Sequence, residues 1–424
     1  MKFFFPDGHE LVDPDYDFNR KHDLPRGIGQ QNGLYAHELI SPPPYDGILL
    51  SRGVIQGKGS DIDATFRDAK YKLSELQRLF RVGATEFFRI GNRPLLIMGD
   101  CGAFSYRHEN EVPYSVDGVI GFYDSCRVNC GVSVDHVILG YSAKYDLDNL
   151  FGPIDIPAEW TKRQEMTLTL AHEFLKKAKS GRYNFEPIGA AQGWSPKSYA
   201  HCVAELQKIG YQRIALGGMV SLKSSDVLEV LACISTVRLP ETQLHLLGLN
   251  RMDHFDAFSD FGVTSIDSTS PLTRAFKDER DNYYTDKRTY SAVRVRIADP
   301  KVTRELRQLM AEGKLTQTKA LKLEEDAWNA IIGYGKHRVT LEEALNAILE
   351  YEKPFDTFSG NADRYRETLL DRPWEKCPCE VCKSIGIHCI IFRGAERNRR
   401  RGFHNLYISH RNLQQAIFAK GGSV

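Results

Sequence analysis

Three cysteines stand close together in the stretch WEKCPCEVCK. Cys377, Cys379 and Cys382 form a CxCxxC cluster, and thiolates at this spacing are typical of a tetrahedral zinc site that needs a fourth ligand. The candidates for that ligand are His404, His410 and Cys389, and unligated thiols are the alternative. A shell of three cysteines and one histidine is closed, with no position for a catalytic water, so it predicts a structural metal.

Two carboxylates follow apolar runs that are predicted to be buried strands. Asp100 ends the run in IMGDCGAF, and Asp267 ends the run in GVTSIDSTSPLTR. If both strands belong to one barrel, their carboxyl ends lie at the same mouth and the two side chains meet there. The motif LGGM contains Gly217 and Gly218, which let backbone amides approach a planar ligand. Together these residues predict a pocket, although each carboxylate alone is more typical of a cap or an ion pair.

Arginines are concentrated in the stretch RGAERNRRRGFHNLYISHR. They are Arg393, Arg397, Arg399, Arg400, Arg401 and Arg411. The formal net charge of the chain is only +1, so a nucleic-acid partner requires local positive charge of this kind. The residues expected to contact the phosphates of a polynucleotide are Arg397, Arg399, Arg400 and Arg401. A solvated arginine face on a helix is the alternative.

The elements that must position these residues are predicted by a repeating pattern. Short apolar runs alternate with helix-length segments, as in a parallel sheet covered by helices. The runs are 46–53, 93–100, 134–140, 185–193, 213–218, 244–249 and 262–267. One helix is predicted over 195–210, opened by Ser195 and Pro196 and closed at Gly210. Seven runs, with room for an eighth, favour an α/β fold, a (βα)8 TIM barrel, in which chemistry sits at the carboxyl ends of the strands.

The barrel is predicted over 46–275, and the rest of the chain forms three other segments. Residues 1–45 are rich in Pro, Asp, Gly and His and are expected to be a lead-in made mostly of loops. A helical insertion is expected over 276–373, with one helix capped by Asp299 and another opened by a capping box at Thr340. The C-terminal segment, 374–424, is expected to hold the zinc-binding subdomain and a helix that packs on the barrel.

The composition is that of a globular protein, with 42% hydrophobic and 26% charged residues. The opening residues, MKFFFPDGHE, contain no signal-peptide core, and no stretch approaches a membrane-spanning helix, so we expect no membrane partner. Nine cysteines, an odd number, suit reduced thiols in a cytoplasmic protein better than a disulfide framework.

The order of the motifs GDCGAF, AAQG, ALGGM, LLGL, SIDSTSPLTR, CPCEVC and FHNL resembles the tRNA-guanine transglycosylase superfamily. That superfamily shows Asp-Ser-Gly-Gly-Phe-Gln, a Gln-Gly strand end, a Gly-Gly-Leu turn, a Phe-Asp strand end, CxCxxC and His-Asn-Leu. The resemblance covers roughly residues 45–275 and 374–420. It implies a zinc-bearing (βα)8 barrel that exchanges guanine in a polynucleotide for a 7-deazaguanine base.

The resemblance also implies roles for single residues in the chemistry. Asp267 falls on the nucleophile, which attacks the sugar C1′ and forms a covalent intermediate as guanine leaves. Asp100 falls on the general base and acid that manages the proton of a ring nitrogen. His404 holds the His-Asn-Leu match, which makes it the fourth ligand of one structural zinc ion per chain and makes His410 the weaker candidate.

Other residues fall on groups that bind the target base. Phe104 falls where the superfamily stacks an aromatic ring on the base, which must be flipped out of any duplex. Gln192 and the backbone amide of Gly218 fall on groups that bind the polar edge of the base.

The sequence also departs from the superfamily pattern. The glutamine that ends the first motif is Ser105 here. The tRNA enzymes carry a second base-reading aspartate at the end of the strand that matches VDHVILGYS, and that place holds Gly140 or Tyr141. We therefore expect this contact to be missing or to be supplied from elsewhere, with Asp135 and Asp146 as the candidates.

A long interval separates the two main motifs. Asp267 and Cys377 stand 110 residues apart, whereas the tRNA enzymes keep this interval short. This feature looks like the DNA-modifying branch, the DpdA-type 7-deazaguanine DNA transglycosylases, which insert preQ0 into DNA as part of a modification system. The implied partners are DNA, preQ0, an ATPase that opens the duplex and a second copy of the chain in a homodimer.

Two alternatives remain. One is a tRNA-guanine transglycosylase of the queuosine or archaeosine type, which would act on tRNA. The other is a non-catalytic, zinc-containing paralogue that binds nucleic acid. The presence of both Asp100 and Asp267 argues against the non-catalytic alternative.

Overall fold

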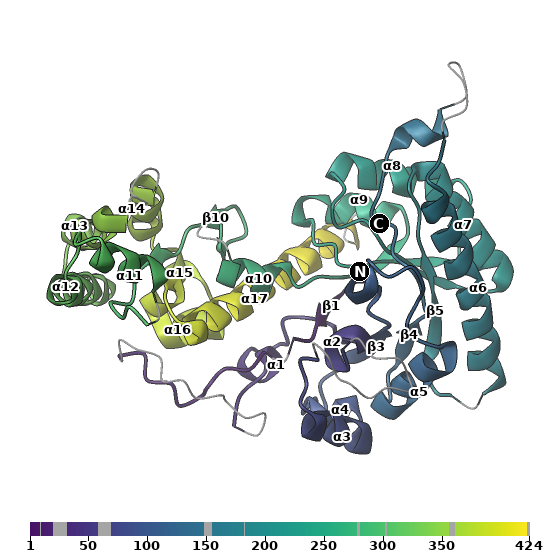
Figure 1. Cartoon of the computed structure of the whole chain (residues 1–424), viewed down its shortest axis with the longest axis horizontal. Helices are drawn as coiled ribbons and strands as arrows, with labels where there is room; N and C mark the ends of the chain where they lie inside the picture. Colours follow the sequence, from purple (N-terminus) through teal and green to yellow (C-terminus); the bar gives the residue numbers. More distant parts are fainter. Residues whose placement is uncertain are drawn as a thin grey trace. The chain divides into compact units, whose positions relative to one another are not determined.

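The structure is a computed structural model, and its helices and strands are labelled in Figure 1. It describes residues 1–8, 10–19, 32–57, 69–147, 155–181, 183–277, 280–301, 303–355 and 361–421. The chain divides into two compact units. The first unit comprises Met1–His9, Tyr45–Thr269 and Asn412–Val424, and the second comprises Glu10–Pro44 and Ser270–Arg411.

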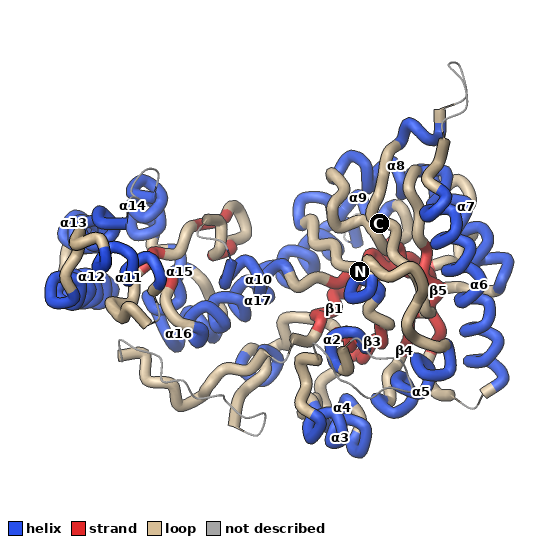
Figure 2. Tube along the Cα trace, viewed as in Figure 1, coloured by secondary structure: helices blue, strands red, loops and turns tan. Residues whose placement is uncertain are grey.

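The first unit is a closed barrel of eight parallel strands that follow one another in sequence order. The strands are β1 (Lys2–Pro6), β2 (Gly47–Ser51), β3 (Leu96–Asp100), β4 (Cys130–Val132), β5 (Glu186–Ala191), β6 (Arg213–Leu216), β7 (Gln243–Leu246) and β8 (Val263–Asp267). Figure 2 shows these strands with helices around them. The predicted (βα)8 TIM barrel is therefore confirmed.

The barrel helices lie between the strands in the sequence. They are α2 (Arg52–Ile55), α3 (Leu73–Val82), α4 (Ala84–Phe87), α5 (Val116–Cys126), α6 (Ala158–Ser180), α7 (Pro196–Ile209), α8 (Ser224–Ser235) and α9 (Phe255–Asp260). Helix α7 has the predicted bounds, because Ser195 is its N-cap and accepts the amide of Ser198, Pro196 is its first residue, and Gly210 closes it at φ +109°.

The barrel interior is filled by side chains from alternate positions of the strands. Because successive side chains of a strand point to opposite faces, residues two apart face the same side. The inner cluster consists of Phe4, Leu49, Met98, Cys130, Val132, Ile188, Ala190 and Ala215. Small and large residues are mixed in it, which fills the space at the density of a core and leaves the carboxyl ends of the strands free for polar groups.

The first strand lies where we expected a lead-in made mostly of loops. Lys2–Pro6 pairs on one side with β2 and on the other with β8, so that Phe4 lies opposite both Gly47 and Asp267. The expectation for these residues was wrong, because the three phenylalanines of KFFFP are a short buried strand. This strand closes the barrel, since β1 is the neighbour of both β2 and β8.

The fourth strand lies just before the run in which we predicted it. Strand β4 ends at Val132, and the apolar segment 134–140 forms no strand. Ser133 ends the pairing with β5, because its hydroxyl accepts the amide of Ala190 at 2.9 Å, a bond that a strand carbonyl would otherwise accept. Strand β4 therefore stops before Asp135 and not at Gly140, and the prediction for this run was wrong.

The second unit is mostly helical. Its helices are α1 (Ala36–Leu39), α10 (Ser270–Lys277), α11 (Arg304–Ala311), α12 (Gln317–Gly335), α13 (Leu341–Glu352), α14 (Asn361–Asp371), α15 (Pro373–Lys376), α16 (Glu380–Ile385) and α17 (Ala395–Gly421), whose last residues belong to the first unit. Two small sheets pair β9 (Tyr283–Tyr284) with β10 (Thr289–Tyr290), and β11 (Val293–Arg294) with β12 (Ile391–Phe392). No helix among the described residues is long and apolar enough to cross a bilayer.

The insertion is helical, as predicted, but only one of its two predicted helix caps is present. Thr340 caps α13, and its hydroxyl accepts the amide of Glu343, as predicted. Asp299 does not cap a helix, because its carboxylate accepts the amide of Lys301 at 2.8 Å in a local turn and α11 begins only after Thr303.

Two buried ion pairs hold the insertion, one within it and one to the segment that follows it. Arg393 pairs with Glu324 of α12, and Arg296 pairs with Glu352 of α13 at 3.0 Å. All four side chains are at most 6% exposed, so removing one partner would leave a buried charge without compensation. The insertion and the segment around the cysteines therefore share one core, and the predicted boundary between them at residue 373 stays a prediction.

Candidate active site and metal centre

The predicted catalytic and base-binding residues gather at the carboxyl ends of the barrel strands. They are Asp100 at the end of β3, Asp135 after β4, Gln192 after β5, Gly217 and Gly218 after β6, and Asp267 at the end of β8. In a (βα)8 barrel these ends form one mouth, where the loops that follow the strands build the site. The first unit therefore brings together residues that lie far apart in the sequence.

Asp267 is held by two hydrogen bonds to the same carboxylate oxygen. Its Oδ1 accepts from the backbone amide of Gly248 at 2.9 Å and lies 3.1 Å from Nε2 of His245. The side chain is 7% exposed. The two bonds fix the orientation of the carboxylate, which is what a nucleophile at this position would require.

Asp100 lies in an environment that favours its neutral form. The pKa of this carboxyl is raised to about 7, mainly by burial and also by the charges of Asp135 and Asp267, while hydrogen bonds from Ser51 and Gly102 act in the opposite direction. A carboxyl with a pKa near neutrality can both donate and accept a proton under ordinary conditions. The charge of Asp267 contributes to this shift, so the two predicted catalytic carboxyls are near enough to influence each other.

Asp135 and Gln192 form a polar floor. Gln192 donates its side-chain amide to Asp135 at 2.6 Å and accepts the backbone amide of Ile138 at 3.2 Å. The thiol of Cys101 lies 3.1 Å from the other oxygen of Asp135, and Tyr106 donates to the carbonyl of Asp135 at 2.8 Å. Burial raises the pKa of Asp135.

The two candidates for the missing base-reading carboxylate, Asp135 and Asp146, have different surroundings. It is the first carboxylate after the end of β4, whereas the predicted strand end at Gly140 or Tyr141 was wrong. Asp146, the other candidate, accepts the amide of Lys197 at the start of α7 at 2.7 Å and is engaged there. Asp135 is thus the carboxylate that lies against Gln192.

The two glycines after β6 lie against Gln192. A Cβ atom on Gly217 would approach the side-chain nitrogen of Gln192 to 2.2 Å, and one on Gly218 would lie 2.5 Å from the carbonyl of Ile138. Gly218 also has φ +75°, which favours glycine. Glycine at both positions therefore lets the backbone lie directly against Gln192 and Ile138, and the predicted approach of these amides to a planar ligand stays a prediction.

Phe104 has the exposure expected of a stacking platform. It lies on a short 3₁₀ turn, Ala103–Tyr106, and is 62% exposed. Arg107 lies over its ring, with its guanidinium carbon 4.3 Å from the ring centre. A large aromatic side chain left in solvent four positions after Asp100 can offer a face to a planar ligand.

Sequence reasoning missed several residues of this site. They are Ser51, Cys101, Tyr106, His245, Gly248 and Ser265. One signal was present, because His245 is the single polar residue in the apolar run LHLLGL of a buried strand. Charged or polar residues are rarely buried in such a strand without a partner.

The cysteine cluster forms a four-ligand group with His404 in the second unit. The ligand atoms of Cys377, Cys379, Cys382 and His404 all lie within 4.8 Å of one another. Nδ1 of His404 lies 3.4 to 3.5 Å from each of the three sulfur atoms. Tetrahedral zinc with ordinary Zn–S and Zn–N distances places sulfur and nitrogen about 3.5 Å apart, so the donor set fits such an ion.

His404 is oriented by groups around it. Its Nε2 lies 2.8 Å from the carbonyl of Tyr284, which fixes Nε2 as the donor and leaves Nδ1 to the sulfur atoms. The ring of Tyr283 stacks on the imidazole at 4.0 Å. Asn405 accepts the amide of Tyr284 and so holds β9 in place, which explains the histidine–asparagine pair of the FHNL motif.

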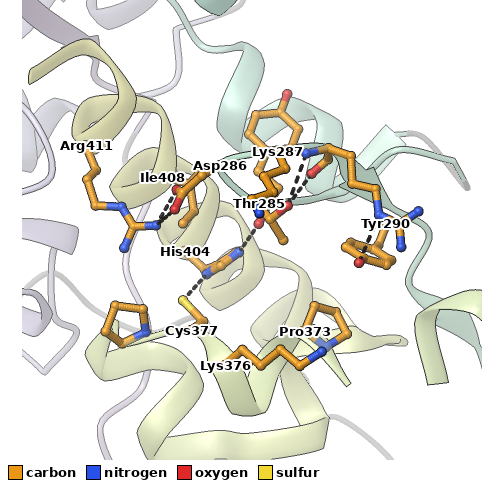
Figure 3. A pocket seen from close by; sticks show the side chains of 13 residues that line it. Thr285, Asp286, Lys287, Tyr290, Pro373, Lys376, Cys377, His404, Ile408 and Arg411 are labelled. Carbon is orange, nitrogen blue, oxygen red and sulfur yellow. Dashed lines mark hydrogen bonds and ion pairs between the residues drawn. The ribbon is translucent and has the colours of Figure 1, made fainter. Parts of the chain in front are cut away.

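Figure 3 shows the surroundings of this group. Cys377 and His404 line a cavity of about 420 Å³, together with Tyr284, Thr285, Asp286, Lys287, Arg288, Tyr290, Pro373, Lys376, Pro378, Ile408 and Arg411. Arg411 pairs with Asp286 across its rim. The other two candidate ligands, His410 and Cys389, are not members of the four-ligand group.

The arginines that we expected to contact phosphates are mostly buried. Arg397 and Arg401 are 0% exposed and Arg400 is 4% exposed. Their guanidinium groups donate to the backbone carbonyls of Phe18, Asp13 and Ala275, all within the second unit. Arg399 pairs with Glu10 at 2.8 Å. The prediction of phosphate contact was wrong for the three buried arginines, because their donors are used inside the protein.

Comparison with known proteins places this geometry in context. No protein-family model matches the sequence. A curated protein from Salmonella montevideo named DNA-guanine transglycosylase is 43% identical over 426 residues, which cover 98% of this chain and 97% of that protein. The match spans nearly the whole of both chains, so the barrel, the helical insertion and the four-ligand group of this chain all lie within the matched length.

Proposed function

Because the chain belongs to the DNA-guanine transglycosylase family of the tRNA-guanine transglycosylase superfamily, we propose that it exchanges guanine in DNA for a 7-deazaguanine base, preQ0. The observation that carries the proposal is the 43% identity, over nearly the full length of the chain, to a protein of that name. The barrel mouth supports it, because it holds two carboxylates, Asp100 and Asp267, that act on each other electrostatically.

In the first half of the proposed reaction, Asp267 is the nucleophile. A carboxylate oxygen attacks C1′ of the deoxyribose, and the new C1′–O bond forms as the C1′–N9 bond to guanine breaks. The bonding electron pair leaves with the base, and the positive charge that develops on the sugar is stabilised by the nearby carboxylate. The product is a covalent ester between Asp267 and the DNA strand.

Asp100 carries the proton in both halves of the reaction. Its protonated form donates to the ring nitrogen of the departing guanine, and the resulting carboxylate then accepts the N9 proton of the incoming base. The electron pair of that nitrogen forms the new bond to C1′ as the ester to Asp267 breaks. A pKa raised to about 7 by burial suits a group that must lose and regain a proton in each cycle.

The polar floor and the exposed ring would hold the base. The carboxylate of Asp135 accepts hydrogen bonds from the amino edge of guanine, while the side chain of Gln192 and the amide of Gly218 meet its other polar groups. Phe104 stacks on the flipped base, which exchanges a base–base contact in the duplex for a base–ring contact. This arrangement accepts guanine and 7-deazaguanine alike, because the two share the same pairing edge.

Zinc is the proposed ion of the four-ligand group. Three thiolates and one imidazole form a closed tetrahedral shell, which stabilises the fold and leaves no site for substrate. We also propose a cytoplasmic location, because all nine cysteines are free and three of them must stay reduced to hold the metal. The ATPase partner and the homodimer stay predictions from the resemblance.

The decisive experiment gives the purified protein radiolabelled preQ0 with either duplex DNA, single-stranded DNA or tRNA. We expect label to enter DNA and not tRNA, and we expect a covalent protein–DNA adduct to form when the incoming base is withheld. Asp267→Asn keeps the shape of the side chain and should abolish the adduct, whereas Asp253→Ala, a change at an exposed position, should leave it intact. Incorporation only into tRNA would overturn the choice of DNA.

A further inference from the structure

We propose that His245 is a positioning residue for Asp267, and that it determines which of the two carboxylate oxygens attacks the sugar. The inference rests on the proposed function, because it assigns a role to His245 only if Asp267 is the nucleophile. It is carried by the contacts of the imidazole ring, which links two residues of the neighbouring strand.

Both ring nitrogens of His245 have a partner on β8. Nδ1 lies 2.8 Å from the hydroxyl of Ser265, and Nε2 lies 3.1 Å from Oδ1 of Asp267. An ionised carboxylate only accepts hydrogen bonds, so Nε2 carries the hydrogen in this contact, and the Ser265 hydroxyl donates to Nδ1 wherever that nitrogen carries none. Ser265 thereby fixes the ring in the tautomer and the orientation that Asp267 requires.

The backbone sets up this bridge. Ser265 and Asp267 are two residues apart on β8, so their side chains point to the same face of the strand. The register between β7 and β8 shifts at His245, which pairs with Ser265 while Leu244 pairs with Val263. The extra residue on β8 is a bulge, a device that re-aims side chains next to active sites.

One oxygen of Asp267 is therefore occupied and the other is not. Oδ1 accepts from His245 and from the backbone amide of Gly248 at 2.9 Å. Neither contact involves Oδ2, and no residue of the described ranges is found to donate to that oxygen. Two donors on Oδ1 draw its negative charge and fix the carboxylate plane, so that Oδ2 is the oxygen left to form the bond to C1′.

The ring is also fixed by packing. His245 is 2% exposed, and Phe4 of β1 meets it edge to face with ring centres 6.0 Å apart. A ring held on three sides has little freedom to rotate, so the hydrogen bond to Asp267 is already formed before substrate binds. Such preorganisation lowers the cost of reaching the attacking geometry.

The test compares three variants by the single-turnover rate of adduct formation on DNA, measured with no incoming base present. His245→Phe keeps a ring that can pack on Phe4 but removes both nitrogens, His245→Gln retains a donor, and Ser265→Ala removes only the partner of Nδ1. His201→Leu, at an exposed histidine of α7, is the matched control. Affinity for DNA and thermal stability are measured in parallel.

We expect His245→Phe to slow adduct formation about ten- to a hundredfold, because a hydrogen bond to a charged group is lost, while affinity for DNA is unchanged. His245→Gln should recover part of that loss, Ser265→Ala should show a smaller slowing, and His201→Leu should match the wild type. The proposal is overturned if a folded His245→Phe forms the adduct at the wild-type rate, or if His245→Gln is as slow as His245→Phe at equal stability.

Two further outcomes are distinguishable from these. If His245→Phe does not fold, Ser265→Ala decides, and an unchanged rate in that variant overturns the proposal. If the wild type itself forms no adduct with DNA, the proposed function fails and not the positioning of one carboxylate oxygen by His245.

Discussion

Gln192 donates its side-chain amide to Asp135 across 2.6 Å, although the two residues are 57 positions apart in the sequence. The same side chain accepts the amide of Ile138, so both ends of the Gln192 amide group are fixed. This relationship holds a buried carboxylate at the bottom of the barrel mouth. It makes the polar floor a rigid feature that exists before a base enters.

Gln192→Leu tests this relationship. The change removes a donor from a carboxylate that is 2% exposed, so we expect the free energy of unfolding to fall by about 1.5 to 3 kcal/mol. The KM for the incoming base should rise as well, because the floor loses its amide. Urea denaturation and base-exchange kinetics measure the two effects. Gln212→Leu, at an exposed position, is the control and should change neither quantity.

Asp100→Asn should change how stability depends on pH. The pKa of Asp100 is raised to about 7 in the folded protein, whereas a free aspartate titrates near about 4. The folded state therefore binds a proton that the unfolded chain releases, and this contribution to stability is full below about pH 4 and is lost as the pH rises through about 7.

The asparagine variant does not titrate at this position. The difference in the free energy of unfolding, variant minus wild type, should therefore increase between about pH 4 and about pH 8. The gain is at most about 4 kcal/mol, the value of a three-unit shift. Denaturation curves at several pH values measure it. If the free energy of unfolding depended on pH in the same way in both proteins, the pKa of Asp100 would not be raised in the folded state.

Cys379→Ser tests the metal centre. We expect the bound metal to fall from one ion per chain to well below one, and the second unit to lose stability, because metal binding at such sites is worth on the order of 10 kcal/mol. Elemental analysis and thermal melting measure these changes. Cys233→Ser, on the outer helix α8, should keep the full metal content. Full metal content in Cys379→Ser would point to a different set of ligands.

Arg401→Met tests the correction concerning the arginines. Burial lowers the pKa of Arg401 to about 10, and its guanidinium donates to the carbonyls of Ala275, Cys389 and Ile391. Losing these bonds should cost about 2 to 4 kcal/mol of stability. The salt dependence of DNA binding should not change, because a buried arginine neutralises no phosphate. If a folded variant reduced the slope of log K against log salt concentration by about one, Arg401 would contact a phosphate after all.

Much of the barrel could be predicted from the sequence, because parallel strands buried on both faces are continuous apolar runs. Six of the seven predicted runs coincide with strands. The other run, 134–140, was misleading because it is more apolar than Cys130–Val132, the strand that precedes it. That strand ends where the amide of Ala190 donates to the Ser133 hydroxyl. The two residues are 57 positions apart, so no local pattern reports this contact.

The site was predictable where a motif marked it and not where a long-range contact did. Asp100, Asp267 and the cysteine cluster stand in short recognisable patterns. His245 and Ser265 act through a shift in the register between two strands, which no local pattern reports. The prediction of phosphate contact by the arginines was wrong for the same reason, since a carbonyl that accepts from Arg401 belongs to Ala275, 126 positions away.

Strand β1 is synthesised before every other strand of the barrel, and one of its two partners, β8, is Val263–Asp267. While the protein is still on the ribosome, the sheet therefore stays open, with an unpaired edge on each side, until β8 has emerged. Unpaired edges in a nascent parallel sheet are templates for pairing with other chains. Production at low temperature, or with a chaperone that covers these edges, should raise the soluble yield more than it does for a protein whose first strands pair locally.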